Sequence, residues 1–255
     1  MKPIPDWVIF HVPHDATAIP DAVRSHFVLS EAELNAEVLR MTDHLTYALF
    51  TRGVSTGQVV RFPVSRLVVD PERFENDALE PLAALGMGVI YQRTSSGNAL
   101  RHPITESERQ ALIDTWYRPH HEQLTSTIQR TLHEYGRVLI IDAHSFSAKP
   151  MRHEADQRIP RPAICIGTDN FHTPTALSQT LLAAFRLDGF VVQLNAPFSG
   201  ALVPMSFYRI NPLVHSVLIE VNRTLYINEA TGQPNENFDE IAERIRRCIS
   251  LSLAY

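Results

Sequence analysis

Apolar runs that stop at polar, chemically versatile side chains occur at three places far apart in the sequence. They are residues 138–145 (VLIIDAHS), 7–15 (WVIFHVPHD) and 216–223 (SVLIEVNR). A continuous run of β-branched and other apolar residues is typical of a strand buried on both faces. Because open α/β sheets place their sites at the carboxyl ends of strands, we expect the polar residues of these runs to meet at one edge of a sheet.

Strand-like and helix-like segments alternate along the rest of the chain. A capping-box pattern at residues 30–33 predicts the start of a helix that carries Asp43, and the charged, proline-containing residues 149–162 predict an exposed loop. The alternation favours an α/β fold with a mixed, mostly parallel sheet covered by helices on both faces. Besides the three runs, the expected strands are residues 58–64, the first part of 65–73, 87–91, 163–167 and 190–194, and the expected helices are residues 30–52, 105–135 with an interruption at Pro119, 175–187 and 237–253.

Composition narrows the class of protein. The chain has 255 residues, 44% apolar and 20% charged, which fits one globular domain spanning residues 1–255. A formal charge of -5 gives no electrostatic reason to expect nucleic acid. No apolar run approaches the roughly 18 residues of a membrane helix, and the first residues show no apolar h-region or cleavage site, so we expect a soluble, intracellular protein. Cys165 and Cys248 lack CxxC partners, which excludes structural zinc on thiolates and fits a reducing cytoplasm.

Histidines and a carboxylate near strand ends are candidate metal ligands. A zinc hydrolase needs about three protein ligands and one position left for water, and His14, Asp43 and His144 could supply them. None of these residues has the spacing of an HExxH motif, and a histidine at a strand end is often only hydrogen-bonded. His11 and His14 would point to opposite faces of an extended segment. We prefer His14, because Pro13 places it in the loop.

Three further charged residues suit catalysis or substrate binding. Glu220 lies in an apolar run, where desolvation raises the pKa of a carboxyl group and makes it a candidate general base and acid. The alternative is a structural salt bridge from Glu220 to Arg223 or another arginine. Arg66 and Arg73 could hold a carboxylate by paired hydrogen bonds, although exposure at the surface would also explain either arginine.

An ordered set of short motifs resembles the N-formylglutamate amidohydrolase family over roughly residues 9–229. The family resembles zinc carboxypeptidases and aspartoacylases, which implies a three-layer α/β/α fold of the carboxypeptidase type, also called phosphorylase/hydrolase-like. The motifs are residues 13–15 (PHD) followed by Pro20, 42–43 (TD), 65–73 (SRLVVDPER), Tyr117 with 119–121 (PHH), 142–145 (DAHS), 167–169 (GTD), 195–200 (NAPFSG) and 219–226 (IEVNRTLY).

The resemblance implies a zinc-dependent amidohydrolase acting on a small N-formyl or N-acyl amino acid through a metal-activated water. It implies Zn²⁺ at His14 and His144, with Glu220 as the proton shuttle. The relatives take their carboxylate ligand three residues after the first histidine, where this chain has Thr17, so we predict Asp43 as the third ligand. The other implied roles are stabilisation of the oxyanion by Arg66 and substrate contacts by Arg73, His121, Asn195, Asn222 and Arg223.

The chain departs from the family pattern at Glu72, where the family usually has asparagine. A carboxylate there would repel an anionic substrate or hold Arg73 in a salt bridge. Phe198 replaces the usual tyrosine, and Ala201 replaces the second glycine of a pair.

Two other classes of function stay open at this point. One is a metal-binding protein of the same fold without turnover, which the change at Glu72 favours. The other is a metal-independent serine hydrolase that uses Ser145 or Ser199, although the chain has no Gly-x-Ser-x-Gly motif.

Overall fold

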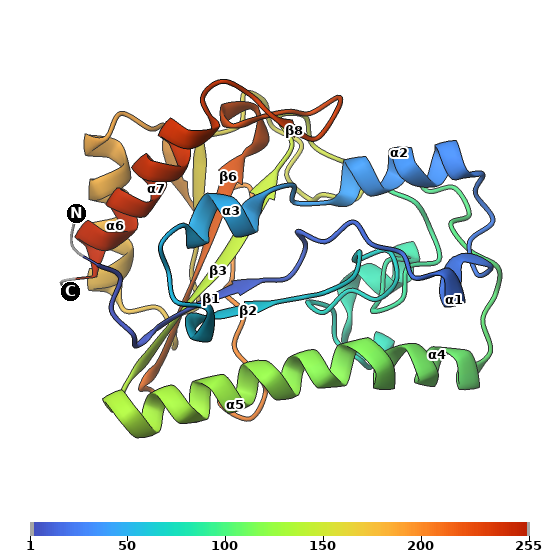
Figure 1. Cartoon of the computed structure of the whole chain (residues 1–255), viewed down its shortest axis with the longest axis horizontal. Helices are drawn as coiled ribbons and strands as arrows, with labels where there is room; N and C mark the ends of the chain where they lie inside the picture. Colours follow the sequence, from blue (N-terminus) through green and yellow to red (C-terminus); the bar gives the residue numbers. More distant parts are fainter. Residues whose placement is uncertain (1–2, 254–255) are drawn as a thin grey trace.

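A six-stranded mixed sheet forms the centre of the computed structural model, which describes residues 3–253 (Figure 1). The strand order is β2-β1-β3-β6-β4-β5, in which β2, β1, β3 and β6 are parallel, β4 runs antiparallel to β6, and β5 is parallel to β4. The α/β architecture with a mostly parallel sheet is therefore confirmed. The strands are β1 (Val8–Val12), β2 (Val59–Arg61), β3 (Val138–Phe146), β4 (Ile164–Gly167), β5 (Val192–Leu194) and β6 (Val214–Asn222), and β7 (Ile227–Asn228) pairs with β8 (Gln233–Pro234) in a second, small sheet.

Helices cover both faces of the sheet, with α5 on one face and α3, α6 and α7 on the other (Figure 1). No helix of residues 3–253 is long and apolar enough to cross a membrane. The α-helices are α1 (Asp21–Arg24), α2 (Glu31–Met41), α3 (Thr46–Thr51), α4 (Glu106–Leu112), α5 (Arg118–Tyr135), α6 (Thr175–Leu187) and α7 (Phe238–Ser252). Short 3₁₀ turns span Thr56–Gln58, Asp77–Leu79, Pro81–Leu85 and Arg223–Leu225, and a π-helical turn spans Ile113–Tyr117.

Alternate residues of the central strands enter two different cores. In β3, Leu139 and Ile141 pack in the core under α3, α6 and α7, whereas Val138 and Ile140 pack against α5. Successive side chains of a strand point to opposite faces, so a strand covered on both faces must be apolar throughout. This requirement explains why the run at 138–141 is continuous and why it predicts the central strand.

The helix predicted for residues 30–52 is broken in the structure. Helix α2 has the expected capping box at Ser30 but ends at Met41, and α3 begins only at Thr46. Leu45 adopts a left-handed conformation with φ of 63°, which a helix cannot continue through. Asp43 therefore lies between two helices and not on one, and its backbone N–H donates to the carbonyl of His14 (2.9 Å).

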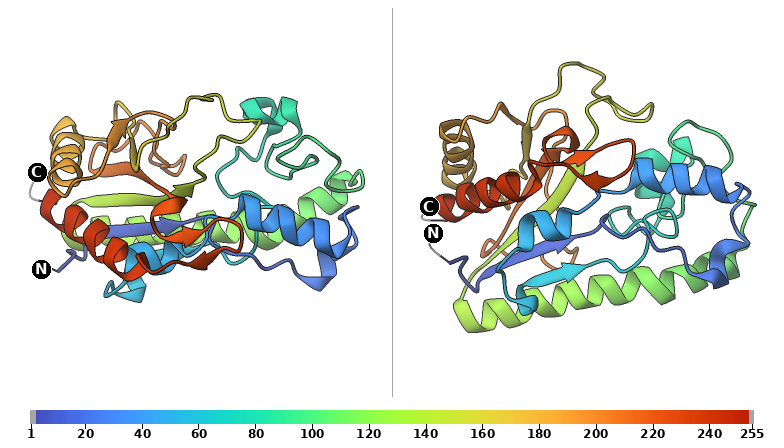
Figure 2. Two further views of the ribbon diagram at one scale, coloured as in Figure 1. Left: turned by 90° about the horizontal axis from the view of Figure 1, so that it is seen from above. Right: turned by 45° about the horizontal axis from the view of Figure 1, so that its top comes forward.

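Two of the predicted strands are wrong, because residues 65–69 and 87–91 form no strand. Their apolar residues instead build two smaller cores with α2 and α4, so burial and not sheet pairing accounts for their composition. In both views of Figure 2, residues 63–105 lie with α1 and α2 at the end of the molecule opposite the two chain termini. The helical region 105–135 does not end at Pro119: α4, the π-helical turn Ile113–Tyr117 and α5 follow one another without a gap. A π-helical turn directly before Pro119 is the kind of local distortion by which a helix accommodates a proline.

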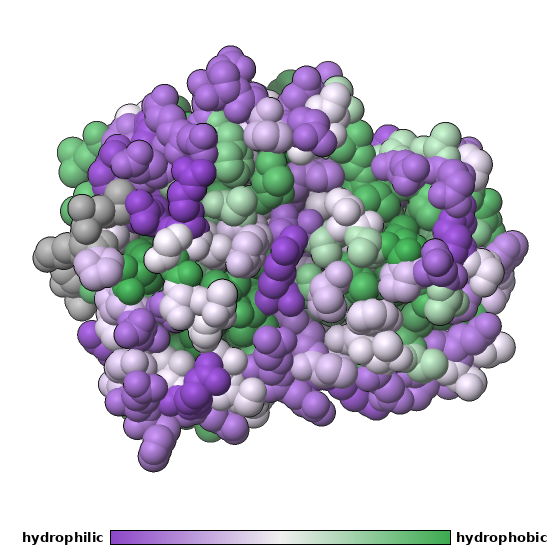
Figure 3. Space-filling model, viewed as in Figure 1, coloured by the Kyte–Doolittle hydropathy of each residue, from purple (hydrophilic) through white to green (hydrophobic). Residues whose placement is uncertain are grey.

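The surface seen in Figure 3 mixes hydrophilic and hydrophobic residues. Such a mixture is ordinary for a globular protein and does not point to a function.

Candidate active site

The carboxyl ends of β1, β3 and β6 bring the predicted residues together. His144 on β3 is the register partner of Glu220 on the parallel neighbour β6, and His14 follows β1 by two residues. Together with Asp43, these residues line a cavity of about 530 Å³. The expectation that the three apolar runs end at one edge of the sheet is therefore met.

Each of the two histidines is held from behind by a buried carboxylate. His144 donates from Nδ1 to Asp43 (3.0 Å), and His14 donates from Nε2 to Asp70 (2.9 Å). Hydrogen bonds of this kind fix the ring orientation of metal-binding histidines and leave the second nitrogen as the ligand. The second nitrogen of His14, Nδ1, is buried and lacks a hydrogen-bond partner within residues 3–253.

The second ring nitrogens of both histidines lie near Glu72, a residue outside the predicted ligand set, and that of His14 is equally close to Asp43 (3.8 Å in each case). One oxygen of Glu72 lies 3.2 Å from His144 Nε2, and the other lies 3.8 Å from His14 Nδ1. The ligand atoms of these three residues all lie within 4.8 Å of one another, so they could hold a metal ion. Two imidazole nitrogens and one carboxylate are the ligand set of many catalytic zinc sites.

The carboxylates around His144 also favour a positive charge at this site. Burial alone would lower the pKa of His144, but Glu72 and Asp142 outweigh it and hold this pKa well above its usual range. The oxygen of Asp142 lies 3.1 Å from His144 Nε2. A proton or a metal ion can supply the charge that these carboxylates require, so the donor set fits a divalent cation.

A second possible metal group consists of His11, Glu72 and Asp142. Both ring nitrogens of His11 are engaged, since Nδ1 contacts Asp142 (2.8 Å) and Nε2 contacts His120 (2.9 Å). The geometry thus leaves a free nitrogen on His14 and none on His11.

Asp43 and Asp70 are ionised and tied to cations. Burial would raise the pKa of Asp43, but His14, whose Nδ1 lies 3.8 Å away, the hydrogen bond from His144 and the charge of Arg223 hold it well below its usual range. Burial is likewise outweighed at Asp70, whose pKa the charge of Arg66 holds well below its usual range. The closest arginine nitrogens lie 2.8 Å from Asp43 (Arg223) and 2.7 Å from Asp70 (Arg66).

Glu220 has the environment of a general base. Its side chain is buried, its Oε2 has no hydrogen-bond partner in the described part of the chain, and burial raises its pKa to about 8. The alternative role, a salt bridge from Glu220 to Arg223 or another arginine, is not seen within residues 3–253, and Arg223 pairs with Asp43 and donates to Ser145 instead. A carboxyl group that titrates near neutral pH can accept and return a proton.

The two other candidate arginines also line the cavity. Arg66 donates to Asp70, and Arg73 lies 3.9 Å from both Asp70 and Glu80, which is too far for a hydrogen bond. The Nε of Arg73 is buried and finds no acceptor within residues 3–253. Arg73 therefore keeps a donor that a substrate could use.

Three predicted substrate contacts lie outside the cavity lining. His121 donates to the carbonyl of Pro71 (2.8 Å), Asn222 donates to the carbonyl of Pro162 (3.1 Å), and Asn195 exchanges hydrogen bonds with Thr168. Their hydrogen bonds are with the protein itself, so the geometry gives them a role in shaping loops.

Sequence reasoning assigned no role to Asp70, Asp142 or Tyr91, and it placed Glu72 beside the substrate and not among the possible metal ligands. Asp70, Asp142 and Tyr91 hold histidines or arginines in place, Tyr91 by donating its hydroxyl to Asp70, and Glu72 completes the possible ligand set. The Asp-x-Glu spacing of residues 70 and 72 was visible, but nothing in it shows that Asp70 meets a histidine 56 positions earlier.

A second cavity of about 690 Å³ lies between α2 and residues 147–152. Within the described residues it holds no possible metal group, so the chemistry places the candidate site in the first cavity.

Comparisons with known proteins show the family of the chain. A family model described as N-formylglutamate amidohydrolase matches residues 7–227. The chain is 24% identical over 228 residues to the N-formylglutamate deformylase of Pseudomonas aeruginosa, and 26% identical over 229 residues to that of Pseudomonas putida. Each match covers 87% of this chain and 82% of the relative.

Solved structures show the same fold. The chain resembles an N-formylglutamate amidohydrolase from Ralstonia eutropha JMP134 with a TM-score of 0.83 and 21% identity, over 97% of this chain and 93% of that one. It also resembles a gene product of Agrobacterium tumefaciens with a TM-score of 0.69 and 20% identity, over 97% and 90% of the two chains.

Proposed function

This chain belongs to the N-formylglutamate amidohydrolase family, and we propose that it is a zinc-dependent hydrolase that cleaves the amide bond of an N-formyl or N-acyl amino acid. One observation carries the proposal. His14 and His144, each fixed by a buried carboxylate, turn their second nitrogens toward Glu72, and Glu220 lies beside them as an unpaired buried acid.

We propose His14, His144 and Glu72 as the residues that hold the metal. Asp43, the predicted third ligand, already accepts from His144 and Arg223, so it suits the orientation of His144 better than coordination. Zinc bound at this site would lower the pKa of a water toward about 7 and polarise the substrate carbonyl.

The chain's own residues supply the remaining chemistry. Glu220 accepts a proton from the attacking water at Oε2 and returns it to the leaving amine, which a pKa near neutrality permits. Arg66, fixed by Asp70, donates toward the oxyanion that develops on the former carbonyl oxygen. Arg73 holds a carboxylate of the substrate with its unused donor.

The serine-hydrolase alternative gains no support from the geometry. The hydroxyl oxygen of Ser145 accepts from Arg223 Nε (3.1 Å), and Ser199 is exposed. A serine nucleophile needs a histidine within hydrogen-bond reach as its base. Retention of full activity after removal of metal would restore this alternative.

We further propose that residues 1–255 form one catalytic domain that acts on small molecules in the cytoplasm. The two cysteines are free and buried, which fits a reducing compartment.

The test of the proposed function is turnover of a panel of N-formyl and N-acetyl amino acids by the purified protein, with and without a chelator. We expect hydrolysis that the chelator abolishes and added zinc restores. A zinc-loaded protein that turns over no member of the panel would favour a binding protein without activity.

A further inference from the structure

The loop between β3 and β4 forms one wall of the active-site cavity. Residues 149–162 are predicted as an exposed loop, and Arg152 is indeed exposed, with its guanidinium donating to the carbonyl of Ser96 (3.2 Å). Other residues of the same loop turn inward. Those lining the cavity are Met151, His153, Glu154 and Ala155.

A buried ion pair holds this loop in place. Arg161 pairs with Glu154, and the two side chains are only 1% and 8% exposed. Arg161 also donates to the carbonyl of Ser147 (3.0 Å), and its guanidinium carbon lies 5.1 Å from the ring centre of Phe146 and 5.3 Å from that of Phe198. These contacts tie both ends of the loop to the core, so the inward-facing residues have fixed positions.

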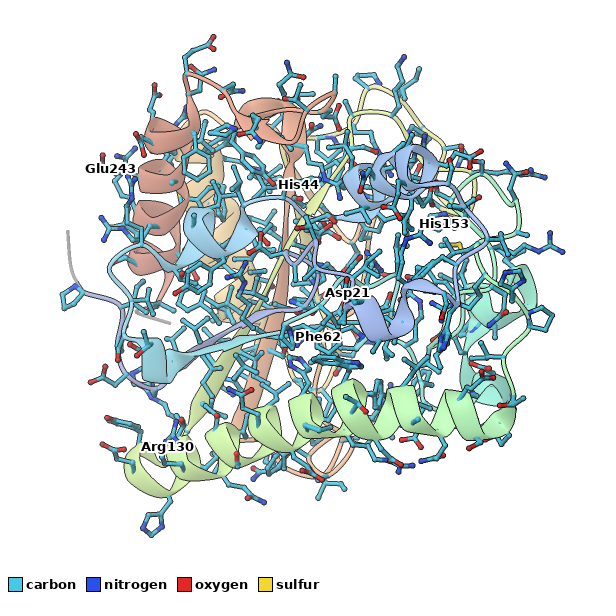
Figure 4. The ribbon with its side chains drawn as sticks, turned by 45° about the vertical axis from the view of Figure 1, so that its right-hand side comes forward. Asp21, His44, Phe62, Arg130, His153 and Glu243 are labelled. Atoms are coloured by element: carbon cyan, nitrogen blue, oxygen red, sulfur yellow. The ribbon has the colours of Figure 1, made fainter. Side chains whose placement is uncertain are left out.

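His153 offers the cavity a hydrogen-bonding group that the protein leaves unused. Its Nδ1 is shielded from solvent and has no partner within the part of the chain that the structure describes. Burial, with smaller contributions from Arg66 and Arg73, lowers its pKa to about 4, so the ring is neutral near pH 7. Figure 4 labels His153 on the side of the molecule away from Glu243 of α7.

The neighbours of His153 define what can bind there. Arg66 forms an ion pair with Asp70 (2.7 Å). Arg73 has no acid within hydrogen-bond distance, and its buried Nε has no partner within residues 3–253. An anion would satisfy Arg73, and a neutral imidazole adds a donor without adding charge. His153 and Arg73 both line the cavity, and each has a buried side-chain nitrogen without a partner within residues 3–253. Two such residues suit a planar anion with two acceptor oxygens.

We propose that His153 and Arg73 together bind a carboxylate of the amino acid that is released, which makes His153 a specificity-determining residue. The inference rests on the proposed function, because it takes an N-formyl amino acid as the substrate. It goes beyond it by assigning a role to a residue outside all the motifs of the family resemblance. Glutamate has two carboxylates, and both share the chemistry that the site requires.

The test compares three substrates that differ only in their carboxylates. They are N-formyl-L-glutamate, N-formyl-L-glutamine, which lacks the side-chain carboxylate, and the α-amide of N-formyl-L-glutamate. We expect His153→Ala to raise the KM for N-formyl-L-glutamate about tenfold with little change in kcat, the size expected for one lost hydrogen bond to a charged group. His153→Gln, which keeps an N–H donor, should restore part of the loss, and Arg152→Ala should leave all constants unchanged.

The pattern over the substrates identifies the carboxylate. The amide for which His153→Ala has the smaller effect lacks the group that His153 binds. An equal change in KM for all three substrates, or no change, would overturn the inference.

Calorimetric binding of N-formyl-L-glutamate to each variant separates this inference from the proposed function. If the wild type binds but does not turn over, weaker binding by His153→Ala supports the role of His153 while the proposed hydrolysis fails. Equal binding by the two proteins, or no binding by the wild type, overturns the role of His153.

Discussion

His144 and Glu220 are direct register partners on the parallel strands β3 and β6. The candidate metal ligand and the candidate base are therefore placed by the sheet itself. Side chains on neighbouring strands are held in position more precisely than side chains on loops. The hydrogen bond from His144 Nδ1 to Asp43 then fixes which ring nitrogen faces the cavity.

We predict that Glu220→Gln lowers kcat by at least about a hundredfold while zinc stays bound, which is the usual size of a lost general base. Glutamine keeps the shape of the side chain and cannot accept the proton. Steady-state kinetics and metal analysis on the same preparation check this. The exposed Glu236→Gln serves as the matched control, and near-normal turnover by Glu220→Gln would remove Glu220 from the mechanism.

We predict that the raised pKa of Glu220 makes the free energy of unfolding of the metal-free protein depend on pH. Burial raises the pKa of Glu220 to about 8 from an ordinary value of 4.5, so the folded state holds its proton more tightly than the unfolded state. Stability from this group is present below about pH 4.5 and is lost as the pH rises to about 8. Denaturant unfolding between pH 5 and pH 8 should show a smaller loss for Glu220→Gln than for the wild type. Parallel curves for the two proteins would contradict the raised pKa.

The central strands could be predicted from the sequence, because burial on both faces of the sheet requires a continuous apolar run. Residues 138–141 and 217–219 are apolar without interruption, because the helices on both faces of the sheet leave no solvent-exposed face on these parts of β3 and β6. Helix α6 was predicted with its observed bounds. Residues 65–69 and 87–91 were misread as strands, since burial in an irregular segment selects the same side chains.

The site was only partly predictable, because some of its residues lie at strand ends and others lie in irregular segments. His14, His144 and Glu220 follow apolar runs, and their position at strand ends is readable. Glu72 and His153 lie in irregular segments without any period, and only the folded chain shows that they reach the same cavity. The predicted repulsion of substrate by Glu72 assumed a carboxylate beside a substrate site at Arg73, whereas the closest contact of the Glu72 carboxylate is His144 (3.2 Å).

We predict close to one zinc per chain in protein refolded with excess zinc, and loss of tight binding in His144→Ala. The alanine removes one of two nitrogen ligands, and a competing chelator with a known zinc affinity measures the loss. His133, exposed on α5, provides the control His133→Ala. Refolded wild-type protein without zinc would contradict the metal site.

The contacts favour Glu72 over Asp43 as the third metal ligand. If Glu72 coordinates zinc and Asp43 only orients His144, Glu72→Gln should weaken zinc binding more than Asp43→Asn, whose effect should be about tenfold to a hundredfold. Asparagine at position 43 can still accept from His144. Chelator competition on both variants measures the two affinities, and the reverse order would return the ligand role to Asp43.

Glu72→Asn adds a second readout, which separates a ligand from a residue that acts on the substrate. If Glu72→Asn keeps zinc and lowers the KM for N-formylglutamate with kcat little changed, Glu72 acts on the substrate. Removing its negative charge would then favour binding of the anionic substrate by on the order of 1 kcal/mol, which is several-fold in KM.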